Sequence, residues 1–173
     1  MGGSDFFTVI DISNPAYPRQ TANINLGSTV SSIYVSGRYA YTANADVGSI
    51  SVIDISDSAA PVQVATTSVG TTPQSIYISG RYAYVANFGS NNVSIVDVFN
   101  SSVPVQVTTL SVEKGPYSIF VSGRYAYVAN FTSSTLSVID ISGTEVTSLI
   151  AHSAEVGNLQ SRNDIFDQGN IMG

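Results

Sequence analysis

Four aspartates recur at a constant interval of 43 residues, and they are the first residues of this sequence to consider for chemistry. The four are Asp11, Asp54, Asp97 and Asp140. Carboxylates gathered in a central channel would offer the oxygen ligands that Ca²⁺ prefers. Alternatively, each aspartate accepts hydrogen bonds from the turn after a strand, which explains why every copy carries one. We predict this structural role; Asp46 and Asp57 lie in loops without repeated partners and are weaker calcium candidates.

Arginine and tyrosine recur at the same interval. Each of three arginines, from a total of five, follows a Ser-Gly pair: Arg38, Arg81 and Arg124. An anion-binding ridge is one interpretation. We instead predict that each guanidinium stacks on an aromatic ring, or bonds backbone carbonyls or an acidic group in the adjacent repeat. The tyrosine pairs share one side of a predicted strand and are expected to pack between repeats: Tyr39/Tyr41, Tyr82/Tyr84 and Tyr125/Tyr127.

Two phenylalanines in corresponding loops, Phe88 and Phe131, are the best candidates for exposed aromatic rings. Exposed rings of this kind would indicate a carbohydrate-binding surface. The first copy of the repeat has Ala45 at this position, which weakens the case for a shared motif.

Nucleophilic or metal catalysis finds little support in the sequence. His152 is the only histidine, and no Gly-x-Ser-x-Gly elbow accompanies it. We therefore predict no catalytic, cofactor-binding or metal-binding residue and no cofactor. The Asn-x-Ser/Thr patterns at Asn92, Asn100 and Asn130 are expected by chance in a chain so rich in these residues.

The composition favours strands and turns over helices and excludes several partners. Only 10% of the 173 residues are charged, the net charge is −6, and Lys114 is the single lysine. No basic patch is present to neutralise the phosphates of a nucleic acid. Cysteine is absent, and no apolar run is long enough to span a membrane. The opening Met1-Gly2-Gly3-Ser4 does not resemble a signal peptide.

The hexapeptide Ser-Gly-Arg-Tyr-Ala-Tyr begins at Ser36, Ser79 and Ser122, again 43 residues apart. One copy of the repeat reads as four strands, because β-branched and aromatic residues alternate between turn signals. The second copy predicts strands over 62–67, 75–78, 81–86 and 93–98. Ser79-Gly80 between two of them is a hairpin turn.

Four-stranded units of 40–45 residues are typical of β-propeller blades. We predict an all-β fold, a β-propeller or part of one, with four-stranded antiparallel blades. The predicted blades are 13–55, 56–98 and 99–141, preceded by an orphan last strand in 1–12 and followed by a divergent tail, 142–173. A β-solenoid is the chief alternative, although its coils are usually shorter.

Two motifs in the repeat resemble known repeat families. Residues 84–97, Tyr-Val-Ala-Asn-Phe-Gly-Ser-Asn-Asn-Val-Ser-Ile-Val-Asp, resemble the YVTN-type propeller repeat, and Val-Ile-Asp-Ile-Ser-Asn-Pro at 9–15 resembles the LVIVD-type repeat. The resemblance covers roughly residues 5–142. It implies a secreted or cell-surface propeller, and it supplies no catalytic residues to transfer.

Three blades are too few to close a ring, since propellers have typically four to eight. We expect a second copy of the chain to complete the ring as a homodimer, with residues 1–12 as a closure strand. A fourth blade built from 143–171 and 5–12 and a fragment of a longer protein are the alternatives.

The sequence thus predicts a non-catalytic scaffold or recognition module with a protein or glycan partner and an extracellular or cell-surface location. A carbohydrate-binding propeller and a lactonase-like hydrolase are the alternative functions. The hydrolase would need His, Glu, Asn or Arg residues that differ between blades, and these copies are nearly alike.

Overall fold

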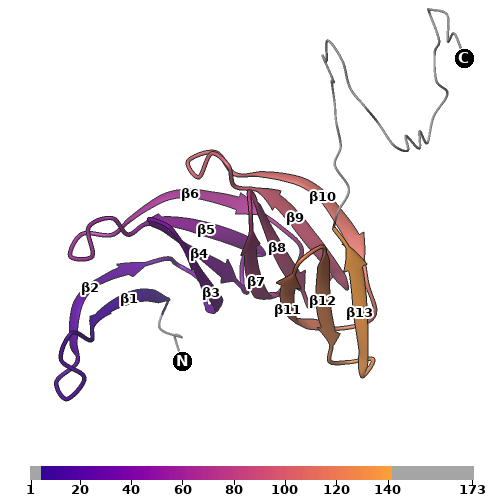
Figure 1. Ribbon diagram of the computed structural model, residues 1–173, viewed down its shortest axis with the longest axis horizontal. Coiled ribbons are helices and arrows are strands. Elements are labelled where there is room, and N and C mark those ends of the chain that lie inside the picture. Colours follow the sequence, from indigo (N-terminus) through magenta and orange to yellow (C-terminus); the bar gives the residue numbers. More distant parts are fainter. Residues whose placement is uncertain (1–4, 142–173) are drawn as a thin grey trace, which may run out of the picture. The chain divides into compact units, whose positions relative to one another are not determined.

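The computed structural model describes residues 5–141, and the regular structure in this range consists of strands (Figure 1). The strands are β1 (Phe6–Asp11), β2 (Arg19–Asn25), β3 (Val30–Ser36), β4 (Tyr39–Asn44), β5 (Ser49–Asp54), β6 (Val62–Ser68), β7 (Pro73–Ser79), β8 (Tyr82–Asn87), β9 (Asn92–Asp97), β10 (Val105–Ser111), β11 (Pro116–Ser122), β12 (Tyr125–Asn130) and β13 (Thr135–Asp140). The four strands predicted for the second copy are confirmed as β6, β7, β8 and β9.

Hydrogen bonding groups these strands into antiparallel sheets in which neighbours in sequence are neighbours in space. Two sheets have four strands, β3-β4-β5-β6 and β7-β8-β9-β10. Within residues 5–141, β11-β12-β13 form a three-stranded sheet and β1-β2 a two-stranded one. The predicted all-β fold with four-stranded antiparallel sheets is therefore confirmed.

The sheets divide the chain at different places from the predicted blades 13–55, 56–98 and 99–141. The complete sheets run over 30–68 and 73–111, and the three-stranded sheet over 116–140. After β5, a turn in which Ala60 N donates to Asp57 O reverses the chain, so β6 returns along β5 and ends its sheet. The chain also reverses after β1, and β2 returns along it. Because β2 pairs with β1, β1 is not a lone last strand.

Glycine makes the tight turn between the first two strands of each larger sheet. Gly37, Gly80 and Gly123 have φ angles of 59°, 58° and 58°. This left-handed conformation carries no steric penalty for glycine and matches the twist of a two-residue hairpin. Each turn aligns a tyrosine at the start of the next strand with the serine before the glycine, as in the pair Ser79–Tyr82.

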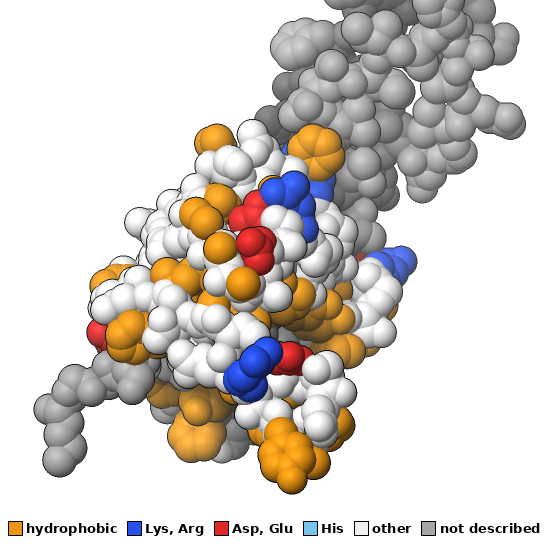
Figure 2. All heavy atoms as spheres, turned by 90° about the vertical axis from the view of Figure 1, so that its left-hand side faces the viewer, with side chains coloured by type: hydrophobic (Ala, Val, Ile, Leu, Met, Phe, Trp, Pro, Cys, Tyr) orange, Lys and Arg blue, Asp and Glu red, His pale blue; other side chains and the backbone are white. Residues whose placement is uncertain are grey.

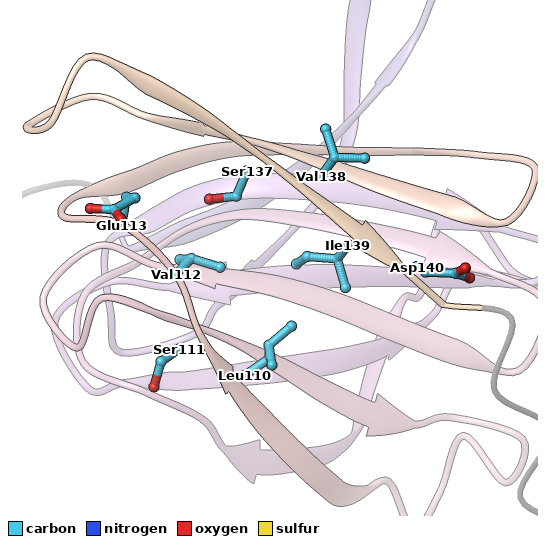
Figure 3. Close-up of a pocket in the computed structure, with 8 residues that line it drawn as sticks. All are labelled: Leu110, Ser111, Val112, Glu113, Ser137, Val138, Ile139 and Asp140. Atoms are coloured by element: carbon cyan, nitrogen blue, oxygen red, sulfur yellow. The ribbon is translucent and has the colours of Figure 1, made fainter.

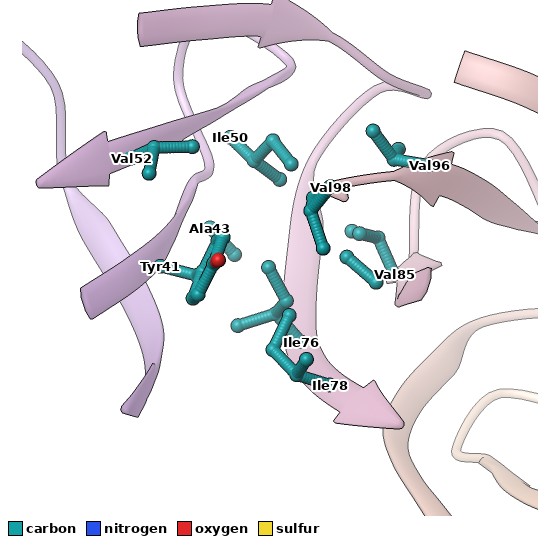
Figure 4. Packing of buried hydrophobic residues seen from close by; sticks show 10 residues of the cluster. Tyr41, Ala43, Ile50, Val52, Ile76, Ile78, Val85, Val96 and Val98 are labelled. Carbon is teal, nitrogen blue, oxygen red and sulfur yellow. The ribbon is translucent and has the colours of Figure 1, made fainter. Parts of the chain in front are cut away.

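The sheets stack face to face, and the core lies between them. Tyr41 and Val52 of one sheet meet Ile76, Ile78 and Val85 of the next in a single buried cluster (Figure 4). A second cluster joins the sheet of β7-β10 to that of β11-β13, and a third joins β1-β2 to the first large sheet. Both faces of a middle sheet are thus apolar, as expected of blades in a stack.

Hydrogen bonds to serine hydroxyls tie β3 to β7 and β7 to β11, the first strands of successive sheets. Ser32 Oγ accepts from Ile76 N at 3.2 Å, and Ser75 Oγ accepts from Ile119 N at 3.2 Å. Equivalent contacts at successive junctions place β3, β7 and β11 side by side. These first strands form the close-packed side of the stack.

A buried asparagine repeats in every large sheet and bonds across it. Asn87 Nδ2 donates to Ser94 Oγ at 2.9 Å, and Asn44 and Asn130 make the same bond. The side-chain oxygen of Asn44 also accepts a hydrogen bond from Thr42 at 3.0 Å. The later copies have valine in place of Thr42, and the amide oxygens of Asn87 and Asn130 have no partner among the described residues.

This difference predicts unequal effects of two exchanges between copies. Thr42→Val should lower the free energy of unfolding by about 1–3 kcal/mol, because it leaves the oxygen of Asn44 buried and unpaired. Val85→Thr should raise it relative to Thr42→Val, because the new hydroxyl can donate to Asn87. Urea denaturation followed by circular dichroism measures both values. A Thr42→Val protein as stable as the wild type would contradict this account.

Candidate functional site

Three aromatic rings meet where the sheet β7-β10 adjoins the sheet β11-β13. We call Phe88, Tyr117 and Phe131 the aromatic cluster. The ring of Phe88 meets that of Tyr117 edge to face, with centroids 6.3 Å apart and an angle of 85°. Tyr117 and Phe131 lie 5.8 Å apart at 43°. Tyr117 is 54% and Phe131 73% exposed, whereas Phe88 is half-buried.

Backbone hydrogen bonds hold the loops that carry the cluster. Phe131 N donates to Gly115 O at 2.7 Å, and Gly115 N donates to the side-chain oxygen of Asn91 at 2.9 Å. Ser133 N donates to Lys114 O at 3.1 Å. The loop before β11 is therefore bonded both to the β8-β9 turn and to the β12-β13 turn, so the cluster has a fixed support.

The predicted exposure of Phe131 is confirmed, while Phe88 is partly covered by Tyr117. The sequence interpretation missed Tyr117, although a difference between the copies could have indicated it. The equivalent of Tyr117 one repeat earlier is Gln74, and the equivalent of Phe88 is Ala45. The aromatic cluster is therefore confined to one junction of a chain whose copies are otherwise alike.

The repeated aspartates lie at strand ends, and three of them cap the following turn as predicted. The amide nitrogens of Ser13, Ser56 and Phe99 donate to Asp11, Asp54 and Asp97 at 2.9, 3.0 and 2.9 Å, respectively.

Each repeated arginine pairs with the aspartate of its own sheet, and not with the adjacent repeat as one interpretation had it. The pairs are Arg38–Asp54, Arg81–Asp97 and Arg124–Asp140. Each guanidinium also lies over the tyrosine that follows it, 5.1–5.5 Å from the ring centroid, which confirms the predicted stacking. The hydrogen bond from Arg81 is the main reason why the pKa of Asp97 is lowered, and Arg38 lowers the pKa of Asp54 in the same way.

The tyrosine pairs occupy the predicted place between sheets. Tyr41 and Tyr84 are 4% and 5% exposed within the inter-sheet clusters. A second aromatic row runs along the first strands, where the Tyr77 ring lies 4.8 Å from Tyr34 and 5.1 Å from Phe120. These rings belong to the packing between sheets. Asn130, one of the three glycosylation-like positions, is only 1% exposed and is therefore inaccessible in the folded chain.

An open groove lies between β10 and β13 (Figure 3). Its lining includes Leu110 and Val112 on one side and Val138 and Ile139 on the other, with the carboxyl groups of Glu113 and Asp140 at its ends. The outer edge of β13 has no strand partner within residues 5–141, whereas the equivalent β9 pairs with β10. The groove is therefore the position of an outer strand and not an enclosed ligand site.

Charged side chains are few on the face beside β1 and β2, where scattered hydrophobic side chains lie among neutral polar atoms (Figure 2). Among residues 5–141, no three His, Cys, Asp or Glu side chains are grouped to hold a metal ion. The same residues include no helix long and apolar enough to cross a membrane. His152 and the divergent tail at 142–173 lie outside the described residues.

These observations define a class: a repeat protein of stacked four-stranded antiparallel sheets with a hydrophobic core at each junction. Within that class the LVIVD repeat matches residues 4–25, 27–68, 70–111 and 117–150, and the chain belongs to this family. Two of the matched repeats, 27–68 and 70–111, enclose the complete sheets at 30–68 and 73–111. The family therefore divides the chain where the hydrogen bonding does.

Several solved propeller-like structures share the fold. A putative 6-phosphogluconolactonase from Bacteroides uniformis matches 81% of this chain and 48% of its own at 17% identity, with a TM-score of 0.68. The periplasmic gluconolactonase PpgL of Pseudomonas aeruginosa matches 79% of this chain and 44% of its own at 24% identity, with a TM-score of 0.68. The hydrazine synthase of Kuenenia stuttgartiensis matches 64% and 32% at 24% identity, with a TM-score of 0.57.

This chain spans less than half the length of each of these three structures. A search of curated protein sequences finds no significant match. At such identities the likeness concerns the fold, and a shared fold does not transfer an activity.

The Arg–Asp pairs predict a defined dependence of stability on pH. Asp97→Asn keeps an oxygen that can accept from Phe99 N but removes the charge that Arg81 favours. A carboxyl pKa that is lowered in the folded state contributes stability above its unfolded value, near 3.8, and loses it as the pH falls through the folded-state value. Asp97→Asn should therefore lower the urea midpoint at pH 7 but not at an acidic pH below both values.

Asp57→Asn is the matched control, since Asp57 caps a turn in a link but forms no ion pair within residues 5–141. Equal loss of stability in Asp97→Asn at neutral and acidic pH would show that the charge plays no part.

Proposed function

We propose that this chain is a non-catalytic β-propeller module for recognition and assembly, and that a second copy of the chain completes its ring of blades. The observation that carries the proposal is a pair of apolar sheet faces that stay uncovered within residues 5–141. One face belongs to the last described sheet and the other to the first large sheet. Both have buried equivalents elsewhere in the chain.

The trailing face, on the sheet of β11-β13, includes Phe120, Leu136 and Val138, which are 56%, 62% and 56% exposed. In the preceding sheets the positions of Leu136 and Val138 are covered by the next sheet. Ile50 and Val52, their equivalents in the first large sheet, are both 0% exposed. The trailing face is thus a surface of the kind that this fold normally buries.

The leading face, on β3, includes Ile33 and Val35, which are 51% and 54% exposed. Their equivalents Ile76 and Ile78 are 3% and 7% exposed, because the preceding sheet covers them. The sheet β1-β2 lies on the same side, but its two strands cover Ala40 and Ile53 and leave β3 uncovered.

The two faces fit each other, because equivalents of both already meet inside the chain. Tyr84 of one sheet packs with Ile119 and Val121 of the next. Tyr127 and Phe120 of one copy can therefore pack with the leading face of another copy in the same way. Each side chain that becomes fully buried contributes about 1.5–3 kcal/mol.

The proposed junction is a shared blade. The strands β11, β12 and β13 of one copy hold the first three positions, and β2 of the other copy fills the outer position in the groove beside β13. In this blade β13 takes the place of β1, which holds the same position of the repeat three copies earlier and must part from β2. Two copies then supply four complete sheets and two shared blades. The resulting count of about six lies within the usual range for propellers.

The non-catalytic role is supported by the contacts of the repeated charged residues. The arginines form ion pairs with the aspartates, and the aspartates accept hydrogen bonds from the turns, so both serve the fold. An extracellular or cell-surface location is proposed with it, on the resemblance to surface-protein repeats.

The ring predicts the mass in solution and its response to substitutions. Light scattering after size-exclusion chromatography should give about twice the 18.2 kDa of one chain. Ile33→Asp and Phe120→Asp should each reduce the mass to that of one chain, because a carboxylate would be buried at both junctions. Val107→Asp, at an exposed position of β10 outside both faces, is the control and should leave the dimer intact.

Mixing the two variants sharpens the test, because a pair of unlike copies retains one junction with both wild-type residues. An equimolar mixture of Ile33→Asp and Phe120→Asp should therefore recover part of the dimer. A compact wild-type particle with the mass of one chain would overturn the shared ring.

A lactonase-like hydrolase is the alternative, and its only support is the likeness in fold to the gluconolactonases. We expect hydrolysis of δ-gluconolactone to proceed at the buffer rate with and without Ca²⁺, measured by titration of the released acid. Turnover that a single substitution abolishes would overturn the non-catalytic role.

A further inference from the structure

The exposed part of the aromatic cluster has the properties of a small recognition surface. We infer that Tyr117 and Phe131 form a stacking platform for the pyranose rings of a glucose-type oligosaccharide. This inference deepens the proposed recognition role and rests on it. It depends on the exposure of the two rings, their fixed support and the neutral polar groups around them.

Contacts within the cluster support the two rings. Phe88 and Tyr117 meet edge to face, so Tyr117 has an aromatic neighbour on one side. The backbone bonds from Phe131 to Gly115, and from Gly115 to Asn91, fix the loops beneath. A surface that is ordered in advance loses little entropy on binding.

Two neutral polar side chains, Asn91 and Thr132, lie beside the rings, and the adjoining loop also carries Glu113 and Lys114. Gly115 lies between Asn91 and Thr132, and a Cβ atom on it would come within 2.2 Å of the Thr132 hydroxyl oxygen. Asn91 and Thr132 are both exposed. Within the described part of the chain, the Asn91 amide nitrogen and the Thr132 hydroxyl make no hydrogen bond, so both remain available to a ligand's hydroxyl groups.

This combination favours a sugar over other ligands. A glucose-type ring presents an apolar face of axial C–H groups and a rim of hydroxyls, which matches an aromatic face flanked by an amide and a hydroxyl. Nucleic acid would need a cluster of cations, and Lys114 is the only cation on the adjoining loop. A purely apolar partner would leave Asn91 and Thr132 without hydrogen-bond partners at its contact.

The confinement of the rings to one junction supports a site over general packing. The junction before it, between the sheets β3-β6 and β7-β10, has Ala45 and Gln74 at the positions of Phe88 and Tyr117 and packs in the same way. The aromatic cluster is therefore unnecessary for stacking one blade on the next. Its rings are an addition to a fold that forms without them.

The test is isothermal titration of the full chain with cellohexaose, chitohexaose and maltohexaose. We expect saturable binding of at least one of these hexaoses, and an affinity at least tenfold weaker in both Tyr117→Ala and Phe131→Ala. Tyr17→Ala is the matched control, since Tyr17 is 79% exposed but lies in the β1-β2 link. Thr132→Val removes the flanking hydroxyl without touching the rings and should weaken binding as well.

Circular dichroism establishes that each variant is folded. Absence of saturable binding to all three hexaoses would overturn the inference, as would equal weakening in Tyr17→Ala or binding that survives loss of both rings. Saturable binding of tetramethylammonium in place of the sugars would instead identify an aromatic cation site and also overturn it. The solution mass separates the two proposals, because Phe131→Ala should leave the dimer unchanged while it weakens sugar binding.

Discussion

The structure depends on one constraint: its sheets are apolar on both faces and must be covered on both. In the sheet of β7-β10, Ile76 and Ile78 face the sheet before, while Tyr84 and Val93 face the sheet after. Most sheets with water on one face alternate between apolar and polar residues, and these cannot. Stacking is therefore obligatory for each unit. The same constraint makes the uncovered trailing and leading faces informative, because the equivalent positions Ile50, Val52, Ile76 and Ile78 are buried.

Polar groups give the stack its register. Apolar packing is not directional, so it cannot by itself set how far one sheet slides along the next. The serine hydroxyls on β3 and β7 accept backbone N–H groups of the following sheet and set that position. Inside each sheet the buried asparagine and its serine partner bridge neighbouring strands. Each exposed Arg–Asp pair adds a small stabilisation that depends on pH, and it joins the hairpin turn to the end of the third strand of its sheet.

The copies of the repeat are nearly identical, so the few positions at which they differ are informative. Positions that serve the stack recur at every junction, as the buried asparagine and the Ser-Gly turn do. Positions that differ between copies are not required for stacking. Tyr117 and Phe88 are such positions, since Gln74 and Ala45 serve equally well one junction earlier. A function of this chain beyond its own packing is to be sought where the copies differ.

The sequence by itself determined the strands, their antiparallel order and the structural role of the aspartates. These depend on local alternation, on glycine at the turns and on hydrogen bonds two residues apart. It could not determine where one sheet ends, because a period has no natural starting point and the pairing of β6 with β5 is a tertiary choice. Nor could it place Tyr117 against Phe88, or Arg81 on the aspartate of its own sheet. Those contacts join residues 29 and 16 positions apart, and only the folded arrangement of strands brings them together.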